Sequence, residues 1–325
     1  MRKKSILILT LGTSLLFGCS PSTLLPVDLS YDSEKVEAYY KNGEFEEALT
    51  YIDERIEKYP KDASLHGERG YQLLELGRAD EALDSLDKSL ELDPALESAL
   101  SNKSWALYEL GRFEEAIDFA KEAINLKPDG DMEYINMGNA LSAMDRNQEA
   151  LTYYEEALKI NPNSEYAYYG KGVVNYYIGE YEAALEAFNK YNELIPADID
   201  ALWYLMYTHD GIGNFEEVLA YSNQIIALDP SQIDAYYYKG SVLVDLNKLE
   251  EAVNVYDTVI EKFPESPSGY YGKSRTLMYM EQKEEALKLL AKTIEIDSNY
   301  GNWAYEDPMF YNLIEDDAFL EIIGY

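Results

Sequence analysis

The sequence contains few of the residues that most often carry chemistry. Its 325 residues include one cysteine, Cys19, and two histidines, His66 and His209. A single cysteine excludes a disulfide within the chain. Neither histidine has a second ligand near it at the spacing of a metal site, so we interpret both as packing residues and expect no bound metal and no cofactor.

Basic residues are scarce as well. Lysine and arginine number 27 against 61 aspartates and glutamates, which gives a formal net charge of −34. Such a charge opposes binding to nucleic acid, whose phosphates are also negative. Two interpretations stay open: the acidic residues keep the protein soluble and away from anionic lipid headgroups, or they attract a basic partner.

The N-terminus lacks an apolar run long enough to span a membrane. The run Ile6–Phe17 is interrupted by polar residues and follows the basic residues Arg2, Lys3 and Lys4. A membrane-spanning helix needs about 20 apolar residues. A short apolar run behind a basic start is typical of a secretory signal peptide, which we predict over residues 1–18.

The end of this signal, Leu16-Phe17-Gly18-Cys19, resembles the lipobox of bacterial lipoproteins. The resemblance implies that Cys19 becomes the lipidated first residue of the mature chain and that residues 19–28 hold it on a short linker. Two acyl chains would give a stable anchor. We therefore expect a lipid-anchored protein on the extracytoplasmic face of the cell membrane or in the periplasm. The alternative is a cysteine that is discarded with the signal.

Internal repetition is what the sequence has in abundance. Prolines recur at intervals of 34 residues, a small residue recurs at the same interval, and glycines stand five residues before that small residue. Three series in one register predict a repeat protein. They are Pro60, Pro94, Pro128, Pro162, Pro196, Pro230 and Pro264; Ala48, Ala82, Ala116, Ala150, Ala184, Val218, Ala252 and Ala286; and Gly43, Gly77, Gly111, Gly179 and Gly213.

Each repeat has the pattern of two helices. Apolar residues follow helical spacing, the glycine permits a turn between the helices, and the proline ends the second helix. The series Tyr134, Gly138, Leu141, Ala150, Tyr154 and Pro162 resembles the tetratricopeptide repeat. The resemblance implies an all-α, right-handed α-solenoid over residues 29–300, with about eight hairpins that start near residues 29, 63, 97, 131, 165, 199, 233 and 267.

Three places depart from the pattern. The first repeat is irregular at Asp32 and Val36, as expected of a terminal repeat. The sixth repeat has Met206 and Val218 at its two close-packing positions, from which we predict looser packing of its helices. After the eighth repeat, residues 301–325 carry apolar residues at helical spacing, which predicts a C-terminal cap over the last hairpin.

Catalytic motifs are not evident. Gly272-Lys273-Ser274 looks like the end of a phosphate-binding loop, but Pro267 stands where that loop needs its first glycine. Lys103, Lys171, Lys239 and Lys273 share one register position, so the repeat accounts for this lysine. We expect no enzyme and keep a cryptic envelope hydrolase only as a minor alternative, because carboxylates are abundant.

A binding surface is predicted on the first helices of the repeats, which line the concave face of a solenoid. Tyrosine and tryptophan are enriched there, and both give large contact areas with a polar tip. The alternative is that some of these rings pack between repeats as core. The candidate residues are Tyr71, Trp105, Tyr108, Tyr166, Tyr169, Tyr176, Trp203, Tyr207, Tyr237 and Tyr271.

The kind of partner follows from the residues around these rings. Some tetratricopeptide proteins hold the C-terminal carboxylate of chaperone tails with a clamp of Lys, Asn and Arg, but the matching places here hold Gly67, Ser101, Tyr71 and Trp105. The acidic residues Asp200, Asp210 and Asp234 lie near the rings in sequence. We therefore predict a membrane-tethered, non-enzymatic scaffold for an extended peptide with aromatic or aliphatic and basic side chains; a glycan or small ligand is the alternative.

The predicted anchor can be tested by replacing Cys19 with alanine. We expect the Cys19→Ala variant to lose acyl labelling by radioactive palmitate and to leave the membrane fraction, since one residue is the only attachment point. Fractionation of expressing cells measures both effects. A Cys19→Ala protein that is still cleaved and still sediments with membranes would refute lipidation at this position.

Overall fold

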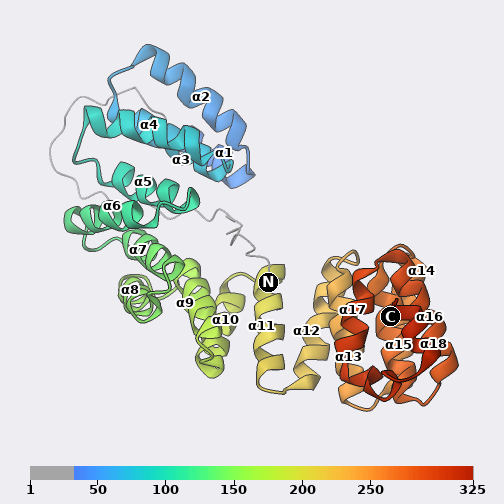
Figure 1. Cartoon of the computed structure of the whole chain (residues 1–325). Coiled ribbons are helices and arrows are strands. Elements are labelled where there is room, and N and C mark those ends of the chain that lie inside the picture. Colours follow the sequence, from blue (N-terminus) through green and yellow to red (C-terminus); the bar gives the residue numbers. More distant parts are fainter. Residues whose placement is uncertain (1–32, 325) are drawn as a thin grey trace. The chain divides into compact units, whose positions relative to one another are not determined.

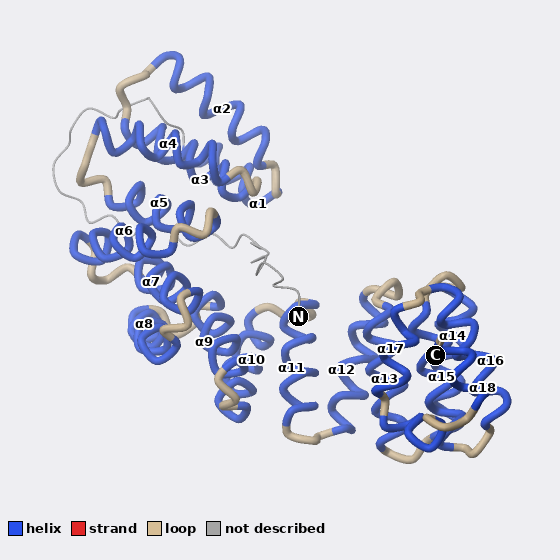
Figure 2. The backbone as a smooth tube through the Cα atoms, in the orientation of Figure 1, coloured by secondary structure: helices blue, strands red, loops and turns tan. Residues whose placement is uncertain are grey.

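The computed structural model describes residues 33–324. The predicted signal peptide, Cys19 and the linker lie outside the described residues. Between residues 33 and 324 the chain consists of helices joined by short loops, with no strand (Figures 1 and 2). None of these helices combines the length and the apolar character needed to cross a membrane.

The helices of residues 33–298 come in eight consecutive pairs, one for each predicted repeat. The pairs are α1 Ser33–Asn42 with α2 Phe45–Lys58, α3 Ala63–Glu75 with α4 Ala79–Leu92, α5 Glu97–Glu109 with α6 Phe113–Leu126, α7 Asp131–Ala143 with α8 Asn147–Ile160, α9 Glu165–Tyr177 with α10 Tyr181–Leu194, α11 Ile199–Gly211 with α12 Phe215–Leu228, α13 Ile233–Asp245 with α14 Leu249–Lys262, and α15 Pro267–Tyr279 with α16 Lys283–Ile296. Three short elements follow: α17 Asn299–Glu306, the 3-10 helix η1 Pro308–Leu313 and α18 Asp317–Ile323.

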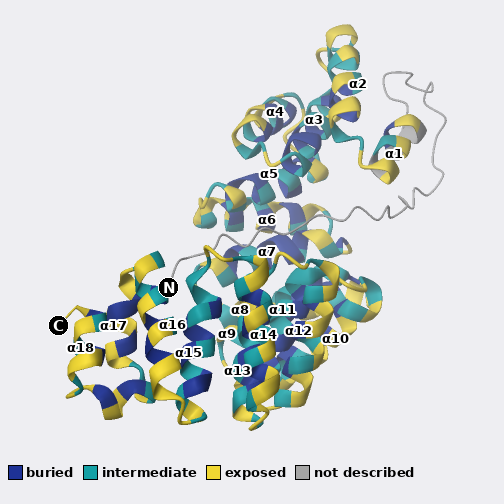
Figure 3. Ribbon diagram, turned by 90° about the vertical axis from the view of Figure 1, so that its right-hand side faces the viewer, coloured by how far each residue is buried: buried dark blue, intermediate teal, exposed yellow. Residues whose placement is uncertain are grey.

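The chain divides into two compact bodies. The N-terminal body ends at Val174 and the C-terminal body begins at Asn175. In each of them a first helix packs against its own second helix and against the neighbouring repeat, as α3 does with α4 and α5. Buried residues lie along the helix faces that meet in this way (Figure 3).

The turn inside each hairpin has one conformation. Gly77 adopts a left-handed backbone with φ of 69°, and its N–H donates to the Leu74 carbonyl while the Arg78 N–H donates to Leu73. These two bonds satisfy carbonyls that the end of a helix leaves free. The repeats that lack the glycine reach the same conformation with Asp145, Asn247 and Glu281, whose φ values are 56° to 60°. The predicted turn is thus present even where its glycine is not.

Within a hairpin, the eighth residue of the repeat, on the first helix, faces the twenty-fourth residue, on the second helix. Their sizes are complementary in several repeats. A Cβ added to Gly138 would lie 2.7 Å from the Tyr154 ring, and one added to Gly70 would lie 2.5 Å from Leu86. Tyr256 fills the space beside Gly240 in the same way. In these three repeats a large residue on the second helix thus faces glycine on the first, whereas the two positions hold Val36 with Ile52 in the first repeat and Ser274 with Leu290 in the eighth.

The sixth repeat inverts this pairing. Met206 takes the glycine position, and Ser222 takes the position of the large residue. Both are fully buried, as is Val218. The small serine thus accompanies the enlarged Met206 and Val218 in this hairpin. Looser packing of its two helices stays a prediction.

The C-terminal cap closes the last hairpin. Phe310, Leu313, Phe319 and Ile323 are buried against Leu290 and other residues of the final repeat. Asp307 joins the cap to α15: its Oδ2 lies 2.7 Å from Arg275 Nε and accepts a 2.8 Å hydrogen bond from the Tyr271 hydroxyl. The all-α prediction of paired helices with a C-terminal cap is confirmed.

The size match can be tested in the sixth repeat. Ser222→Tyr alone should lower the free energy of unfolding by about 1–3 kcal/mol, since the ring has no space beside Met206. Met206→Gly alone should also destabilise, through a cavity and a helical glycine. The double variant recreates the pair found at Gly240 and Tyr256. Its loss of unfolding free energy should therefore be about 1–3 kcal/mol smaller than the sum of the two single losses. Urea unfolding measures all three variants, and strictly additive losses would contradict the size match.

Candidate functional site

Four aromatic rings gather on three first helices of the C-terminal body, and we call them the C-terminal aromatic cluster: Tyr176 of α9, Trp203 and Tyr207 of α11, and Tyr238 of α13. The Tyr207 ring lies 5.3 Å from Trp203, 5.4 Å from Tyr238 and 6.5 Å from Tyr176, measured between ring centroids. Trp203 and Tyr238 are 6.1 Å apart. Tyr207 is therefore the centre of the cluster, and all four rings are half-buried.

The cluster is fixed to the core through Tyr204. This ring stacks on buried Phe188 at 5.1 Å with an interplanar angle of 12° and touches Tyr176 edge-on at 5.6 Å. Exposed Tyr177 lies beside Tyr176 at 5.4 Å. Rings held by neighbours lose little freedom when a partner binds, which favours a preformed contact surface.

The electrostatic surroundings of the cluster are negative. Burial raises the pKa of Tyr238, and the carboxylates of Asp210 and Asp234 raise it further. Burial also raises the pKa of Tyr207, with contributions from Tyr238 and Asp234. The pKa of Asp210 is itself raised, first by burial and then by Asp245. A cation placed here would relieve the repulsion between these groups.

A second set of rings lies in the N-terminal body, and we call Tyr71, Trp105 and Tyr166 the N-terminal aromatic cluster. The Tyr71 and Trp105 rings are 6.2 Å apart, and the Trp105 indole N–H donates to Glu109 at 3.2 Å. Burial and then Glu75 raise the pKa of Tyr71, with a smaller effect from Tyr166. Burial, Glu165 and Glu75 raise the pKa of Tyr166 to about 12. Aromatic and acidic groups thus also share this region.

Two further candidates, Tyr108 of α5 and Tyr169 of α9, also belong to the N-terminal body. Tyr108 packs on Phe113 at 5.8 Å, and burial with nearby Glu109 raises its pKa to about 12. Tyr169 is half-buried on α9.

The last two candidates take part in the attachment of the cap. Tyr271 is only 6% exposed, and its ring contacts Tyr300 at 5.0 Å and Phe310 at 6.3 Å. The Tyr237 hydroxyl accepts a 3.4 Å hydrogen bond from Arg275, which also pairs with Asp307. Tyr271 was predicted to face a partner, with core packing as the alternative. The structure supports core packing, because the cap covers the ring.

Sequence reasoning missed Tyr238, Tyr204 and Tyr177. It took the second, fifth, ninth and twelfth residues of each repeat as the binding stripe, whereas these three tyrosines occupy the sixth and thirteenth positions. Residues four apart share a helix face as surely as residues three apart. The signal was present in the sequence, and a wider stripe would have included it.

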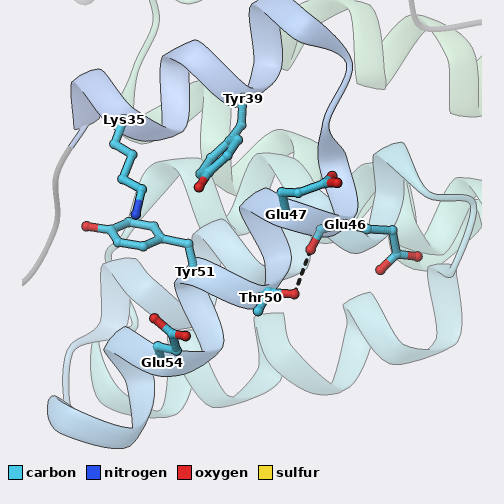
Figure 4. A pocket seen from close by; sticks show the side chains of 7 residues that line it. All are labelled: Lys35, Tyr39, Glu46, Glu47, Thr50, Tyr51 and Glu54. Atoms are coloured by element: carbon cyan, nitrogen blue, oxygen red, sulfur yellow. Dashed lines mark hydrogen bonds between the residues drawn. The ribbon is translucent and has the colours of Figure 1, made fainter.

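Cations lie over aromatic rings at several places between residues 33 and 324, and one of them lines a hollow. A hollow between α1 and α2 is lined by Lys35, Tyr39, Glu46, Glu47, Thr50, Tyr51 and Glu54. The ammonium of Lys35 lies 4.1 Å from the centre of the Tyr51 ring and 5.8 Å from that of Tyr39, and Figure 4 shows it reaching toward these rings. Aromatic rings with carboxylates nearby thus accept a lysine side chain here.

One carboxylate with a strongly shifted pKa lies at the junction of the third and fourth repeats. Glu133 is 2% exposed, and Lys127 Nζ lies 3.7 Å from its carboxylate and 3.1 Å from that of Glu97. Burial, together with a hydrogen bond to Glu97, raises the pKa of Glu133 to about 7. A carboxyl group buried in this way is not accessible to a substrate. We therefore interpret Glu133, Lys127 and Glu97 as part of the packing between the two repeats.

Each histidine ring lies beside another residue of the array. The His66 ring nitrogen lies 3.0 Å from the Pro60 carbonyl, and the His209 ring stacks on Tyr221 at 5.5 Å. No group of three or more His, Cys, Asp or Glu side chains between residues 33 and 324 is arranged to hold a metal ion.

These helical pairs and their register define a class of repeat protein, and sequence comparison gives its family. Models described as tetratricopeptide repeat match residues 34–97, 73–137, 132–164, 165–198 and 234–266. Together these segments cover more than half of the chain. The chain belongs to the tetratricopeptide repeat family, whose members are scaffolds for protein interaction.

Solved structures share the fold. The type IV pilus biogenesis factor PilW is 20% identical, with a TM-score of 0.56 over 65% of this chain and 96% of PilW. PilF of Pseudomonas aeruginosa is 21% identical, with a TM-score of 0.52 over 62% of this chain and 92% of PilF. YrrB, described as a tetratricopeptide protein with an unusual peptide-binding site, is 27% identical over 55% of this chain and 92% of YrrB, with a TM-score of 0.49. No curated protein matches the sequence.

The shifted pKa of Glu133 predicts how pH changes stability. Its folded-state pKa of about 7 lies above the ordinary 4.5, so the folded protein holds this proton more tightly than the unfolded chain. The stabilisation that this tighter proton binding gives the folded protein is fully present below about pH 4.5 and is lost as the pH rises to about 7. Glu133→Gln, which keeps the shape without the charge, should therefore exceed the wild type in stability by about 1–3 kcal/mol at pH 8 and match it near pH 4.5.

Urea unfolding at both pH values measures this difference, with the exposed Glu122→Gln as the control for charge removal on the neighbouring α6. A gap between Glu133→Gln and wild type that is the same at both pH values would show that Glu133 does not titrate in this range.

Proposed function

We propose that the protein is a membrane-tethered, non-enzymatic scaffold that binds an extended peptide with basic and apolar side chains at the C-terminal aromatic cluster. The observation that carries this proposal is the packing of Trp203, Tyr207 and Tyr238 within about 6 Å of one another beside Asp210 and Asp234. Rings of this kind dominate binding energy in protein interfaces.

The charge of the site selects the partner. The charged or ionisable neighbours that shift the pKa values of Tyr176, Tyr207 and Tyr238 are carboxylates and phenols. A lysine or arginine gains from the ring faces and from the carboxylates together. The position of Lys35 over Tyr51 is an example of the same preference within the chain.

The tether is the other half of the proposal. Lipidation of Cys19 would leave about ten residues before the first repeat, a reach of roughly 33 Å when extended. The scaffold would then hold its partner close to the extracytoplasmic face of the membrane. The excess of acidic over basic residues would also keep the array off anionic lipid headgroups, so a tether and a repulsive surface would act together.

A glycan ligand is the second candidate, because half-exposed tryptophan and tyrosine rings also stack on sugars. It differs from the first in charge dependence: binding of a neutral sugar ring does not weaken with salt, whereas binding of a basic peptide does.

The double variant Trp203→Ala and Tyr207→Ala tests the peptide site. Wild type should bind a fluorescent eight-residue peptide of alternating lysine and leucine, and the double variant should bind it at least about tenfold more weakly, as expected when two central rings are lost. Fluorescence anisotropy at two salt concentrations measures both the affinity and its salt dependence.

The control variant is Tyr311→Ala, which removes a 53% exposed ring from the cap. It should bind as the wild type does, and circular dichroism should show an intact helical fold in all variants. Equal binding by wild type and the double variant, or preference for a peptide with glutamate in place of lysine, would contradict the proposal. Salt-independent binding of a neutral oligosaccharide that is lost in the double variant would favour the glycan.

A further inference from the structure

An ion pair between consecutive repeats recurs at one register position. The seventh residue of a repeat is basic in several repeats, and it pairs with a carboxylate 16 residues earlier, on the second helix of the preceding repeat. The pairs are Arg69 with Asp53 at 2.7 Å, Lys103 with Asp87, Lys171 with Glu155 at 3.4 Å, and Lys273 with Asp257 at 2.6 Å.

Lys239 is the member of this series without its carboxylate. The residue 16 positions earlier is Asn223, which carries no charge. Among residues 33–324, no carboxylate lies at ion-pair distance from Lys239. The four complete pairs show that the basic residue at this position accepts a carboxylate partner. In the seventh repeat that carboxylate is missing.

A hollow lies at this place. Leu219 and Asn223 of α12, Lys239 and Leu243 of α13, and Glu251, Asn254 and Val255 of α14 line it. These three helices are consecutive in the C-terminal body (Figure 1). The lining combines one ammonium, one carboxylate, two amides that can donate hydrogen bonds, and three aliphatic side chains.

We propose that this hollow binds a carboxylate group on an apolar stem, supplied by a glutamate or aspartate side chain or by the C-terminus of a partner peptide. The carboxylate takes the place that Asp257, Glu155, Asp87 and Asp53 hold in the sister repeats. It accepts hydrogen bonds from the Lys239 ammonium and from the Asn223 amide, while the stem packs on Leu219, Leu243 and Val255. Charge-assisted bonds of this kind are stronger than neutral ones.

Glu251, which also lines the hollow, limits what this site can bind. Its negative charge opposes a second carboxylate and weakens the first, so the hollow suits one acidic group within a longer segment. More distant acidic residues of the chain are screened at physiological salt, where the Debye length is about 8 Å. The site uses none of the residues of the C-terminal aromatic cluster, so it does not depend on the function proposed above.

The first experiment uses isovalerate as the probe, a carboxylate on a branched apolar stem, with isovaleramide as its neutral counterpart. NMR spectra of the folded protein report the side-chain amide resonances of Asn223 and Asn254. We expect isovalerate to shift both resonances with saturation and isovaleramide to shift neither. Equal shifts with the amide would mean a site for apolar groups alone and would overturn the proposal.

Three variants test the assignment to Lys239. Lys239→Gln should weaken binding of isovalerate at least about tenfold, as loss of a charged partner does. Asn223→Asp supplies the missing carboxylate from within the chain, so it should abolish binding and slightly raise the melting temperature. Glu251→Gln should tighten binding about two- to fivefold, since one opposing charge is removed. For Asn223→Asp, whose reporter side chain is changed, the Asn254 resonance is read.

Lys273→Gln is the matched control, because its lysine is already paired with Asp257. It should leave binding unchanged. Retained binding in Lys239→Gln or in Asn223→Asp would refute the site, and both variants report on it even if the aromatic cluster binds no peptide.

Two peptides then separate the sources of the carboxylate. One carries an internal glutamate between leucines and an amidated C-terminus, and the other carries only leucines and a free C-terminal carboxylate, with an acetylated N-terminus in both. If the glutamate peptide competes with isovalerate, the hollow accepts a carboxylate side chain. If the peptide with the free C-terminus competes, the hollow accepts the terminus of a chain. If neither competes, the hollow does not receive a peptide carboxylate and the proposal fails.

Discussion

The array depends on how closely the two helices of each hairpin approach. Glycine on the first helix leaves a space that a large side chain of the second helix fills, as Gly138 does for Tyr154. Where the first helix carries Met206, the second carries Ser222, and both stay fully buried. The first helices α9, α11 and α13 of three consecutive repeats then bring Tyr176, Tyr207 and Tyr238 together.

Basic side chains are scarce, and several of them lie at defined positions of the repeat. The chain has 27 basic residues against 61 acidic ones, and many of the basic side chains form ion pairs with a defined partner. One group of them joins repeats at a fixed position, as Lys171 does with Glu155. Arg78 and its counterparts pair with a glutamate three residues on, at the start of a second helix. The carboxylates of Asp210 and Asp234 lie near the C-terminal aromatic cluster, and the proposed preference for a positively charged partner rests on them.

Much of the candidate site could be read from the sequence, and its errors have physical causes. Trp203, Tyr207 and Tyr176 come together as the register predicts, because first helices of neighbouring repeats stack with one face in common. Tyr271 has the same register position as Trp203, yet the cap covers it. No repeat-based argument contains the cap, which packs once, at the end of the chain. Tyr238 was missed because a helix face is broader than the stripe of four positions taken to represent it.

The sequence by itself determined the helical pairs, their length and the turns between them, because these depend on local spacing, on glycine and on proline. It also determined the acidic character and the shortage of catalytic groups. Only the tertiary structure decided which rings touch, which carboxylates are buried and which lysine lacks its partner. Lys239 and Lys273 are equivalent in sequence register, and they differ in environment because one faces Asn223 and the other faces Asp257. That difference lies in a contact between helices, where side chains distant in sequence set each other's surroundings.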